Sequence, residues 1–151
     1  MANRNRVLED LQAAGVLCAT ADDTARLGRE IAAELCDGAV VSLEGPLGAG
    51  KTQLTKGIVR ALGCGVAVSS PSFAILHEYE GGRLAVHHFD FYRMEEAGEL
   101  TTVGYDDCLA DGVTIVEWGD KFPEALPAGT WRIRLEVRTD GGRRIRGGRT
   151  L

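Results

Sequence analysis

A phosphate-binding pattern occupies one short stretch in the first half of the chain. The pattern G-x-x-x-x-G-K-[ST] is matched at every fixed position by the consecutive residues Gly45, Pro46, Leu47, Gly48, Ala49, Gly50, Lys51 and Thr52. Its glycines allow positive φ angles and let backbone N–H groups approach phosphate oxygens without a Cβ in the way. Lys51 would reach the β- and γ-phosphates, and the Thr52 hydroxyl would help to coordinate Mg²⁺. The stretch therefore predicts a site for a nucleoside triphosphate and Mg²⁺.

Two acidic residues at predicted strand ends would complete this site. Phosphate-loop enzymes need a carboxylate near Mg²⁺ and a group that orients the attacking water. Glu117 closes the uninterrupted apolar run 113–116, so we assign it to the metal, whereas Asp90 ends a run interrupted by histidines and is assigned to the water. The two roles could be exchanged, and either acid could instead cap a helix or pair with Arg93.

Two further features could lie beside the triphosphate. Residues 69–73 form an extended, hydroxyl-rich turn that could sit at the γ-phosphate. The indole of Trp118 follows Glu117 directly and would lie close to the nucleotide, although a place in the core is the other interpretation. An [NT]-K-x-D segment that reads guanine is absent from the sequence, because Lys121 lies in Gly-Asp-Lys-Phe. We therefore expect adenine as the base.

The residues around the phosphate loop predict a strand before it and a helix after it. Residues 39–43 are a nearly continuous apolar run, as expected of a strand buried on both faces of a parallel sheet. Beyond the loop, Leu54, Ile58 and Leu62 recur at helical spacing, and Gly63 stands where a helix-ending glycine belongs. This order is the structural context that a phosphate loop requires.

Hydrophobic periodicity and turn residues predict the other elements. We expect a helix within residues 1–16, a short strand at 17–19, a helix N-capped by Thr20 or Asp22, a hairpin of 74–80 and 83–91 with a two-residue turn at Gly81-Gly82, short helices within 94–110 broken at Gly104, a buried strand at 113–116, and strands at 131–137 and 143–146.

Length and composition favour a single soluble domain. At 151 residues, with 44% hydrophobic and 26% charged residues, the chain can bury a core without a metal or a disulfide. We predict an α/β fold: one P-loop NTPase-like domain over residues 18–151, with a mixed, mostly parallel sheet, antiparallel additions and flanking helices. Residues 1–17 form an N-terminal extension that could be helical. The sequence has neither an apolar run of membrane-spanning length nor a signal-like core, which favours the cytoplasm.

Cysteine and histidine spacing indicates no metal site. The four cysteines are far apart, with no C-x-x-C pair and no histidine at ligand spacing: Cys18, Cys36, Cys64 and Cys108. At alternating strand positions, one of His87 and His88 faces the core and the other the opposite face. A structural role is the favoured interpretation for both histidines.

Basic residues are concentrated at the C-terminus. The net charge is −5, yet residues 132–151 hold seven Arg against Glu136 and Asp140, so the rest of the chain carries −10. Such a segment could contact RNA. The alternation of Arg with apolar residues is also typical of the solvated face of an edge strand, and this interpretation is favoured.

Four motifs together carry a resemblance to a known family. Gly45–Thr52, Ser70-Pro-Ser-Phe73, His88-Phe-Asp-Phe-Tyr-Arg93 and Val116-Glu-Trp118 follow one another as in the TsaE (YjeE) family. The resemblance covers about residues 20–146. It is far more specific than the phosphate loop alone.

This resemblance implies a bacterial, Mg²⁺-dependent ATPase of the tRNA threonylcarbamoyladenosine pathway, which modifies adenosine 37 of tRNAs that read codons beginning with A. ATP hydrolysis would drive turnover of the TsaD and TsaB partner proteins instead of transferring the group itself, and tRNA would be met through that complex. The resemblance implies these site residues: Lys51 for phosphate, Thr52 for Mg²⁺, Ser72 as a switch-like hydroxyl, and Asp90, Glu117 and Trp118 in the second half of the site. It also places residues 20–24 and the turn at Gly142 near the adenine.

Two departures from the family pattern and two rival functions stay open. The family usually has Thr at the position of Ser72, and the segment up to about residue 17 is longer than in typical members. One rival is a small-molecule kinase, although no lid segment is evident within residues 64–112. The other is a nucleotide-gated binding subunit without useful hydrolysis.

Overall fold

The computed structural model describes residues 6–65, 67–71 and 73–150. The helices and strands, in chain order, are α1 (Val7–Ala13), β1 (Val16–Cys18), α2 (Ala21–Ala32), β2 (Val40–Glu44), α3 (Lys51–Ala61), β3 (Leu76–Tyr79), β4 (Val86–Asp90), α4 (Glu99–Thr102), α5 (Tyr105–Cys108), β5 (Val113–Glu117), the 3₁₀ helices η1 (Gly119–Lys121) and η2 (Pro123–Ala125), β6 (Trp131–Val137) and β7 (Arg143–Arg149).

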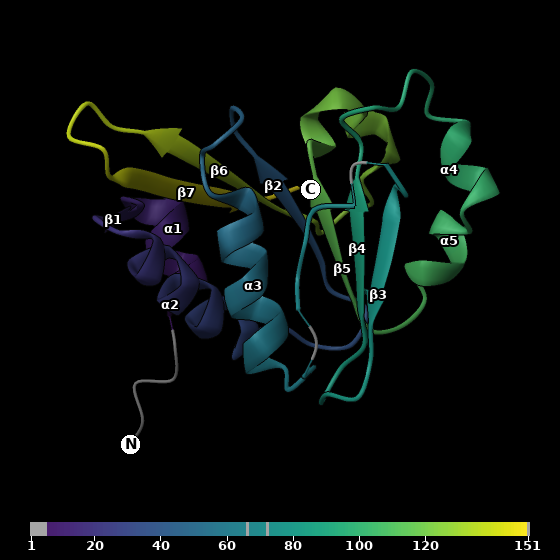
Figure 1. The fold of residues 1–151 in the computed structure, drawn as a ribbon, viewed down its shortest axis with the longest axis horizontal. Helices are drawn as coiled ribbons and strands as arrows, with labels where there is room; N and C mark the ends of the chain where they lie inside the picture. The colour runs from purple at the N-terminus through teal and green to yellow at the C-terminus, as the bar shows by residue number, and fades with distance from the viewer. Residues whose placement is uncertain (1–5, 66, 72, 151) are drawn as a thin grey trace.

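A mixed sheet forms the centre of the molecule (Figure 1). Within the described residues it has seven strands in the order β1-β7-β6-β2-β5-β4-β3. Strands β6, β2, β5 and β4 are parallel neighbours, while β7 and β3 add to this group in antiparallel fashion on its two sides. The predicted α/β class, with a parallel centre and antiparallel additions, is confirmed.

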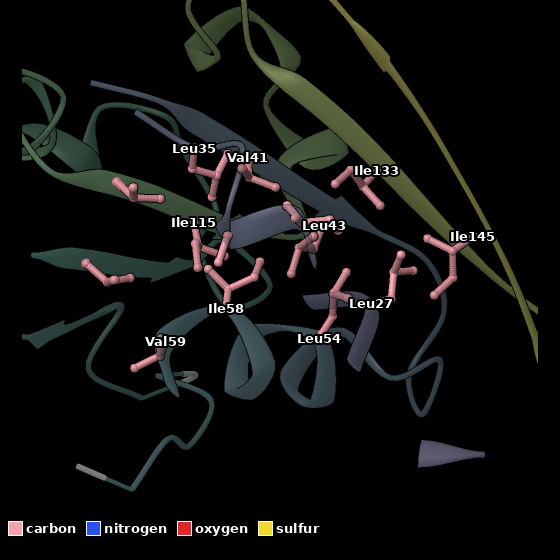
Figure 2. Packing of buried hydrophobic residues seen from close by; sticks show 14 of the residues in the cluster. Leu27, Leu35, Val41, Leu43, Leu54, Ile58, Val59, Ile115, Ile133 and Ile145 are labelled. Atoms are coloured by element: carbon pink, nitrogen blue, oxygen red, sulfur yellow. The ribbon is translucent and has the colours of Figure 1, made fainter. Parts of the chain in front are cut away.

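Helices α2 and α3 cover one face of the sheet and enclose the larger hydrophobic cluster. In Figure 2, Leu54 and Ile58 of α3 point toward Leu43 of β2 and Ile115 of β5. Every residue of β2 and β5 is buried, as predicted for central parallel strands. This packing fixes the start of α3 beside the ends of both strands.

The opposite face of β4 and β5 packs against α4 and α5. A second hydrophobic cluster there includes Phe89, Phe91, Tyr105 and Val116. Gly104 has a φ of 72° between the two short helices, at the predicted break. The two clusters therefore lie on opposite sides of the same strands.

Local signals place the helix ends. Thr20 is the N-cap of α2: its hydroxyl accepts from Asp23 N–H, and the Asp23 carboxylate accepts from the Thr20 N–H. Gly63 follows α3 with a φ of 90°, which is the left-handed conformation expected after a helix. The sequence predicts both features, with Thr20 as one of two candidate N-caps and Gly63 as the helix-ending glycine.

The predicted N-terminal helix is present within residues 1–16, as α1. Helix α1 buries Val7, Leu8 and Leu11 in the larger hydrophobic cluster. Strand β1 follows and pairs with β7. Residues 1–5 of the predicted segment lie outside the described residues, and the division of the chain at residue 17 stays a prediction.

The predicted two-residue turn between β3 and β4 is wrong. The two strands are antiparallel, but their pairing ends at Tyr79 and Val86, which leaves a longer connection. Tertiary contacts pull this connection onto the end of α3: the Arg83 N–H donates to the Leu62 carbonyl at 2.6 Å, and a Cβ on Gly82 would collide with the same carbonyl. A tight turn would break these contacts.

The edge-strand interpretation of the C-terminal arginines is also wrong. Strand β7 lies between β1 and β6 and pairs with both. It extends to Arg149, beyond the predicted end at residue 146. The short strand β1 forms the edge instead. As for membranes, no helix among the described residues is long and apolar enough to cross one.

Candidate functional site

The phosphate loop follows β2 and leads directly into α3. Gly45, Gly48 and Gly50 have φ angles of 149°, 76° and 102°. A Cβ on Gly45 would lie 2.5 Å from the Leu135 carbonyl oxygen, so this position requires glycine for space as well as for conformation. The loop thus brings backbone N–H groups and the start of α3 to one point, which suits an anion.

Lys51 is buried and folded back onto its own loop. Its ammonium donates to the carbonyls of Gly45 and Pro46, each at 2.8 Å, and lies 4.3 Å from the ring centroid of Trp118. Burial lowers the pKa of Lys51, while the negative charges of Glu117, Asp90 and Asp120 oppose that shift. The ammonium is therefore held by weak carbonyl acceptors that a phosphate can replace.

Thr52 and Glu117 meet although they are far apart in sequence. The Thr52 hydroxyl donates to Oε1 of Glu117 at 3.3 Å, and Oε2 of Glu117 lies 2.6 Å from Nε2 of His88. Glu117 is 3% exposed and His88 is fully buried. A hydroxyl and a carboxylate are hard oxygen ligands of the kind that Mg²⁺ takes, so this pair fits the ion.

Asp90 ends β4, beside Glu117 at the end of β5. Its carboxylate accepts from the Ser70 hydroxyl at 2.8 Å and from the Tyr92 N–H at 2.9 Å. Ser70 thereby joins the 69–71 segment to the site. Ser72, which was assigned a switch-like role, lies outside the described residues.

These side chains line one cleft at the carboxyl ends of the parallel strands β2, β5 and β4, where ligands bind in open α/β sheets. The cleft has a volume of about 530 Å³. Five of the predicted site residues line it: Lys51, Thr52, Asp90, Glu117 and Trp118. The fold therefore brings the phosphate loop together with the two predicted acids and the indole. A larger hollow of about 650 Å³ lies at the other end of β2, near Val40, and lacks the phosphate loop.

Trp118, which lines the cleft, and Ile75, which contacts the Asp90 backbone, have strained conformations. They have φ angles of 61° and 68°, which are rare for residues with a Cβ and least favourable for a β-branched side chain. Ile75 stays in place because its N–H donates to Pro71 and its carbonyl accepts from the Asp90 N–H. One strained residue, Ile75, thus holds the backbone of Asp90, and the other, Trp118, directly follows Glu117.

Two residues with direct contacts to the site were missed in the sequence. His88 was assigned a structural role only, yet it contacts Glu117. Arg143 of β7 donates to the carbonyls of Ala49 and Gly48, each at 2.9 Å, and so holds the phosphate loop from outside. No local pattern could reveal Arg143, because its partners precede it by more than ninety residues.

A small pocket of about 90 Å³ adjoins the loop between the start of α2 and the β6–β7 turn. Thr20, Thr24, Gly50 and Gly141 line it. The pocket brings residues 20–24 and the β6–β7 turn together beside the loop, while the expectation that the adenine lies there stays a prediction.

Comparison with known proteins identifies the family. A sequence model described as "Threonylcarbamoyl adenosine biosynthesis protein TsaE" matches residues 18–145. The chain belongs to the TsaE family. The tRNA threonylcarbamoyladenosine biosynthesis protein TsaE of Treponema pallidum is 39% identical over 127 residues, which is 83% of this chain and 93% of that protein. The protein of the same name from Bacillus subtilis is 39% identical over 125 residues, 82% of this chain and 78% of its own.

A solved structure agrees with this assignment. The crystal structure of Bacillus subtilis YdiB matches with a TM-score of 0.72 and 35% sequence identity, over 83% of this chain and 78% of that chain. The range matched by the TsaE family model contains the phosphate loop, Asp90, Glu117 and Arg143, whereas α1 precedes it. The cleft is thus built entirely from the part of the chain that is shared with TsaE.

Proposed function

We propose that this TsaE-family chain binds ATP with Mg²⁺ in the cleft, hydrolyses it, and thereby serves threonylcarbamoyladenosine formation in tRNA. The observation that carries the proposal is the convergence of Lys51, Thr52, Glu117 and Asp90 at the carboxyl ends of three neighbouring strands. Each group has a distinct task in phosphoryl transfer to water.

The backbone of residues 45–50 and the start of α3 bind the phosphates. Lys51 leaves the carbonyls of Gly45 and Pro46 and moves its charge to the β- and γ-phosphate oxygens. Thr52 and Glu117 hold Mg²⁺, which neutralises charge on the β- and γ-phosphates when it is bound. His88 keeps the Glu117 carboxylate in place through Oε2, so that Oε1 stays turned toward Thr52.

Asp90 orients the attacking water. Its hydrogen bonds from Ser70 and the Tyr92 backbone hold it at the edge of the cleft. Ser70 also makes the 69–71 segment sensitive to events at the γ-phosphate, because a change at Asp90 reaches it through one hydrogen bond. Ser72 supplies the switch-like hydroxyl of the same turn.

The reaction yields ADP and phosphate, and it drives a conformational change instead of building a further product. The partners are the TsaD and TsaB proteins, with tRNA met through their complex in the cytoplasm, and hydrolysis resets that complex for another cycle. Residues 18–151 carry the ATPase, and residues 1–17 form its N-terminal extension. Slow hydrolysis by the isolated chain is expected, because a switch needs its partner to complete the cycle.

The test is ATP hydrolysis by the purified chain, first alone and then with TsaD, TsaB and tRNA, with Lys51→Ala as the control. Stimulation by the partners that is lost in Lys51→Ala supports the proposal. Repeated cycles of modification with a non-hydrolysable ATP analogue would instead indicate the nucleotide-gated subunit. ATP consumption that rises with an added small-molecule acceptor would indicate a kinase.

A further inference from the structure

A second group of metal-ligating side chains lies outside the nucleotide cleft. Glu78 of β3, His87 of β4 and Cys108 of α5 each offer a ligand atom, and these atoms all lie within 4.8 Å of one another. Sequence spacing gives no sign of this group, because its members come from three separate elements that only the fold brings together.

The ligand atoms lie close to the separations that one small ion requires. Nδ1 of His87 lies 3.5 Å from Oε1 of Glu78, and Sγ of Cys108 lies 4.0 Å from the same oxygen. A tetrahedral Zn²⁺ with ordinary bond lengths to N, O and S places its ligand atoms about 3.3 to 3.6 Å apart. All three ligand atoms lie within 4.8 Å of one another, so each pair has to close by at most about 1.3 Å to hold an ion.

His87 is the member that most needs a partner. Both of its ring nitrogens are buried without a hydrogen-bond partner, although the side chain is 13% exposed. Glu78 and Asp111 approach the two nitrogens at 3.5 Å, one on each side, without hydrogen-bond geometry. An imidazole that binds a metal through one nitrogen and turns the other to a carboxylate is the usual arrangement at zinc sites. Here Asp111 would be the outer carboxylate.

The local charge also suits a cation. Within the described residues, the ion pairs of Glu78 and Asp111 are both with His87. The carboxylates of Glu78 and Asp111 therefore make the pocket negative, and a cation would relieve that charge. Because Glu78 is half exposed, an ion can reach the group from solvent, and the buried Cys108 can then bind it from the protein interior.

We propose that Glu78, His87 and Cys108 form a binding site for a divalent transition-metal ion, with Zn²⁺ as the preferred ion and Asp111 as the outer partner of His87. One sulfur, one imidazole and one carboxylate oxygen suit Zn²⁺ and discriminate against Mg²⁺ and Ca²⁺. The bound ion ties the outer strand β3 and β4 to α5. A fourth position is left for water.

The site is separate from the nucleotide cleft. Side chains alternate along β4, so His88 and Asp90 face the α3 side while His87 faces α5. His87 also lies toward the start of β4, whereas the cleft lies at its end. Zinc bound at His87 therefore leaves the cleft free for ATP.

Zinc titration of the metal-free chain by calorimetry tests this proposal. We expect the wild type to bind one Zn²⁺ per chain. His87→Gln and Cys108→Ser each remove a direct ligand and should lower the affinity more than about a hundredfold, which exceeds the usual effect of losing a residue that only contacts a ligand. Asp111→Asn should weaken binding about tenfold. If His87→Gln or Cys108→Ser fails to fold, Glu78→Gln still tests the site, because it removes a ligand carboxylate from an exposed side chain and leaves the core intact.

Three controls make the result specific. Cys36→Ser removes an exposed cysteine elsewhere and should bind zinc normally. Glu117→Gln removes a carboxylate of the nucleotide cleft and should also retain the zinc. Co²⁺ used as a probe should give a thiolate charge-transfer band that is present in Cys36→Ser and absent in Cys108→Ser. Equal zinc binding in the wild type, His87→Gln and Cys108→Ser, a loss in Glu117→Gln instead, or no saturable uptake would each overturn the proposal.

Discussion

The Nε2 atom of His88 lies 2.6 Å from Oε2 of Glu117, and both side chains are buried. The two residues come from neighbouring parallel strands and project to the same face, with Asp90 directly opposite Glu117. A buried carboxylate oxygen therefore has a fixed partner, while the other oxygen of the same carboxylate is turned to Thr52. This arrangement makes His88 a positioning residue for the proposed magnesium side of the cleft.

Replacing His88 by Ala should damage both stability and hydrolysis. The change leaves Oε2 of Glu117 buried without a partner, which costs about 1 to 3 kcal/mol in the free energy of unfolding. Loss of orientation should lower ATP hydrolysis at least about tenfold, or about 1.4 kcal/mol of activation energy. Urea unfolding and steady-state ATPase measurements at varied Mg²⁺ check both effects.

Two further variants separate positioning from a general packing effect. His88→Gln keeps one donor toward Glu117 and should recover part of the hydrolysis. Tyr79→Phe removes the hydroxyl 3.4 Å from Nδ1 but leaves the contact with Glu117, and should hydrolyse ATP nearly as well as the wild type. If His88→Ala hydrolysed ATP at the wild-type rate, the contact between His88 and Glu117 would not contribute to hydrolysis.

Replacing Arg143 by Met should weaken ATP binding. Its guanidinium is the donor that holds the carbonyls of Gly48 and Ala49, so its loss frees the phosphate loop. We expect the Kd for ATP to rise roughly tenfold, which is about 1.4 kcal/mol. The matched control is Arg144→Met, because the neighbouring arginine donates to Ala14 and does not touch the loop. Equal affinities of the two variants, measured by calorimetry, would contradict this role.

The phosphate loop and the two acids could be predicted because their signals are local. The apolar run of β2, the glycines and the helix that follows occupy one continuous stretch, and Glu117 directly closes an apolar strand. The roles of His88 and Arg143 depend on strand order: β4 beside β5 brings His88 to Glu117, and β7 beside β6 brings Arg143 to the loop. Periodicity in one strand contains no information on its neighbours.

The wrong turn between β3 and β4 has a similar origin. Gly81-Gly82 favours a tight hairpin on its own. In the fold, however, Gly82 packs closely against the Leu62 carbonyl at the end of α3, and the Arg83 N–H donates to it. Tertiary packing thus overrides a local turn signal. The edge-strand interpretation of the arginines failed because β1, a strand of only three residues, supplies the outer partner of β7.

Binding of Mg²⁺ and ATP should change the fluorescence of Trp118. In the structure, the Lys51 ammonium lies over the Trp118 ring, and nucleotide binding is expected to draw it toward phosphate. Titration of Trp131→Phe, which leaves Trp118 as the remaining indole, should give a saturable change in emission. The change should be absent in Trp118→Phe. An unchanged emission while calorimetry detects binding would mean that Lys51 stays on the ring.

Replacing Gly57 by Ala should destabilise the chain although Ala favours helices. Gly57 lies where α3 touches α2, and a Cβ there would collide with the Ala25 carbonyl. The overpacking should lower the free energy of unfolding by about 2 kcal/mol or more, which outweighs the gain in helix propensity of about 1 kcal/mol. Gly65→Ala is the control, since a Cβ at that position has open space. Equal stability of both variants in urea would contradict this close helix contact.

Alkaline pH should destabilise the chain through Tyr105. Burial, with a smaller effect of Asp106, raises the pKa of this phenol to about 12 from its ordinary value of 10.0. The folded chain therefore keeps a proton that the unfolded chain loses, so the stabilisation is complete below pH 10 and is lost as pH rises from 10 to about 12. Tyr105→Phe also loses the hydrogen bond to the Ala125 carbonyl, which should cost about 1 kcal/mol at neutral pH. Urea unfolding at about pH 9 and about pH 11 should show a smaller loss of stability in Tyr105→Phe than in the wild type. Parallel losses in the two proteins would show that this phenol does not govern the alkaline transition.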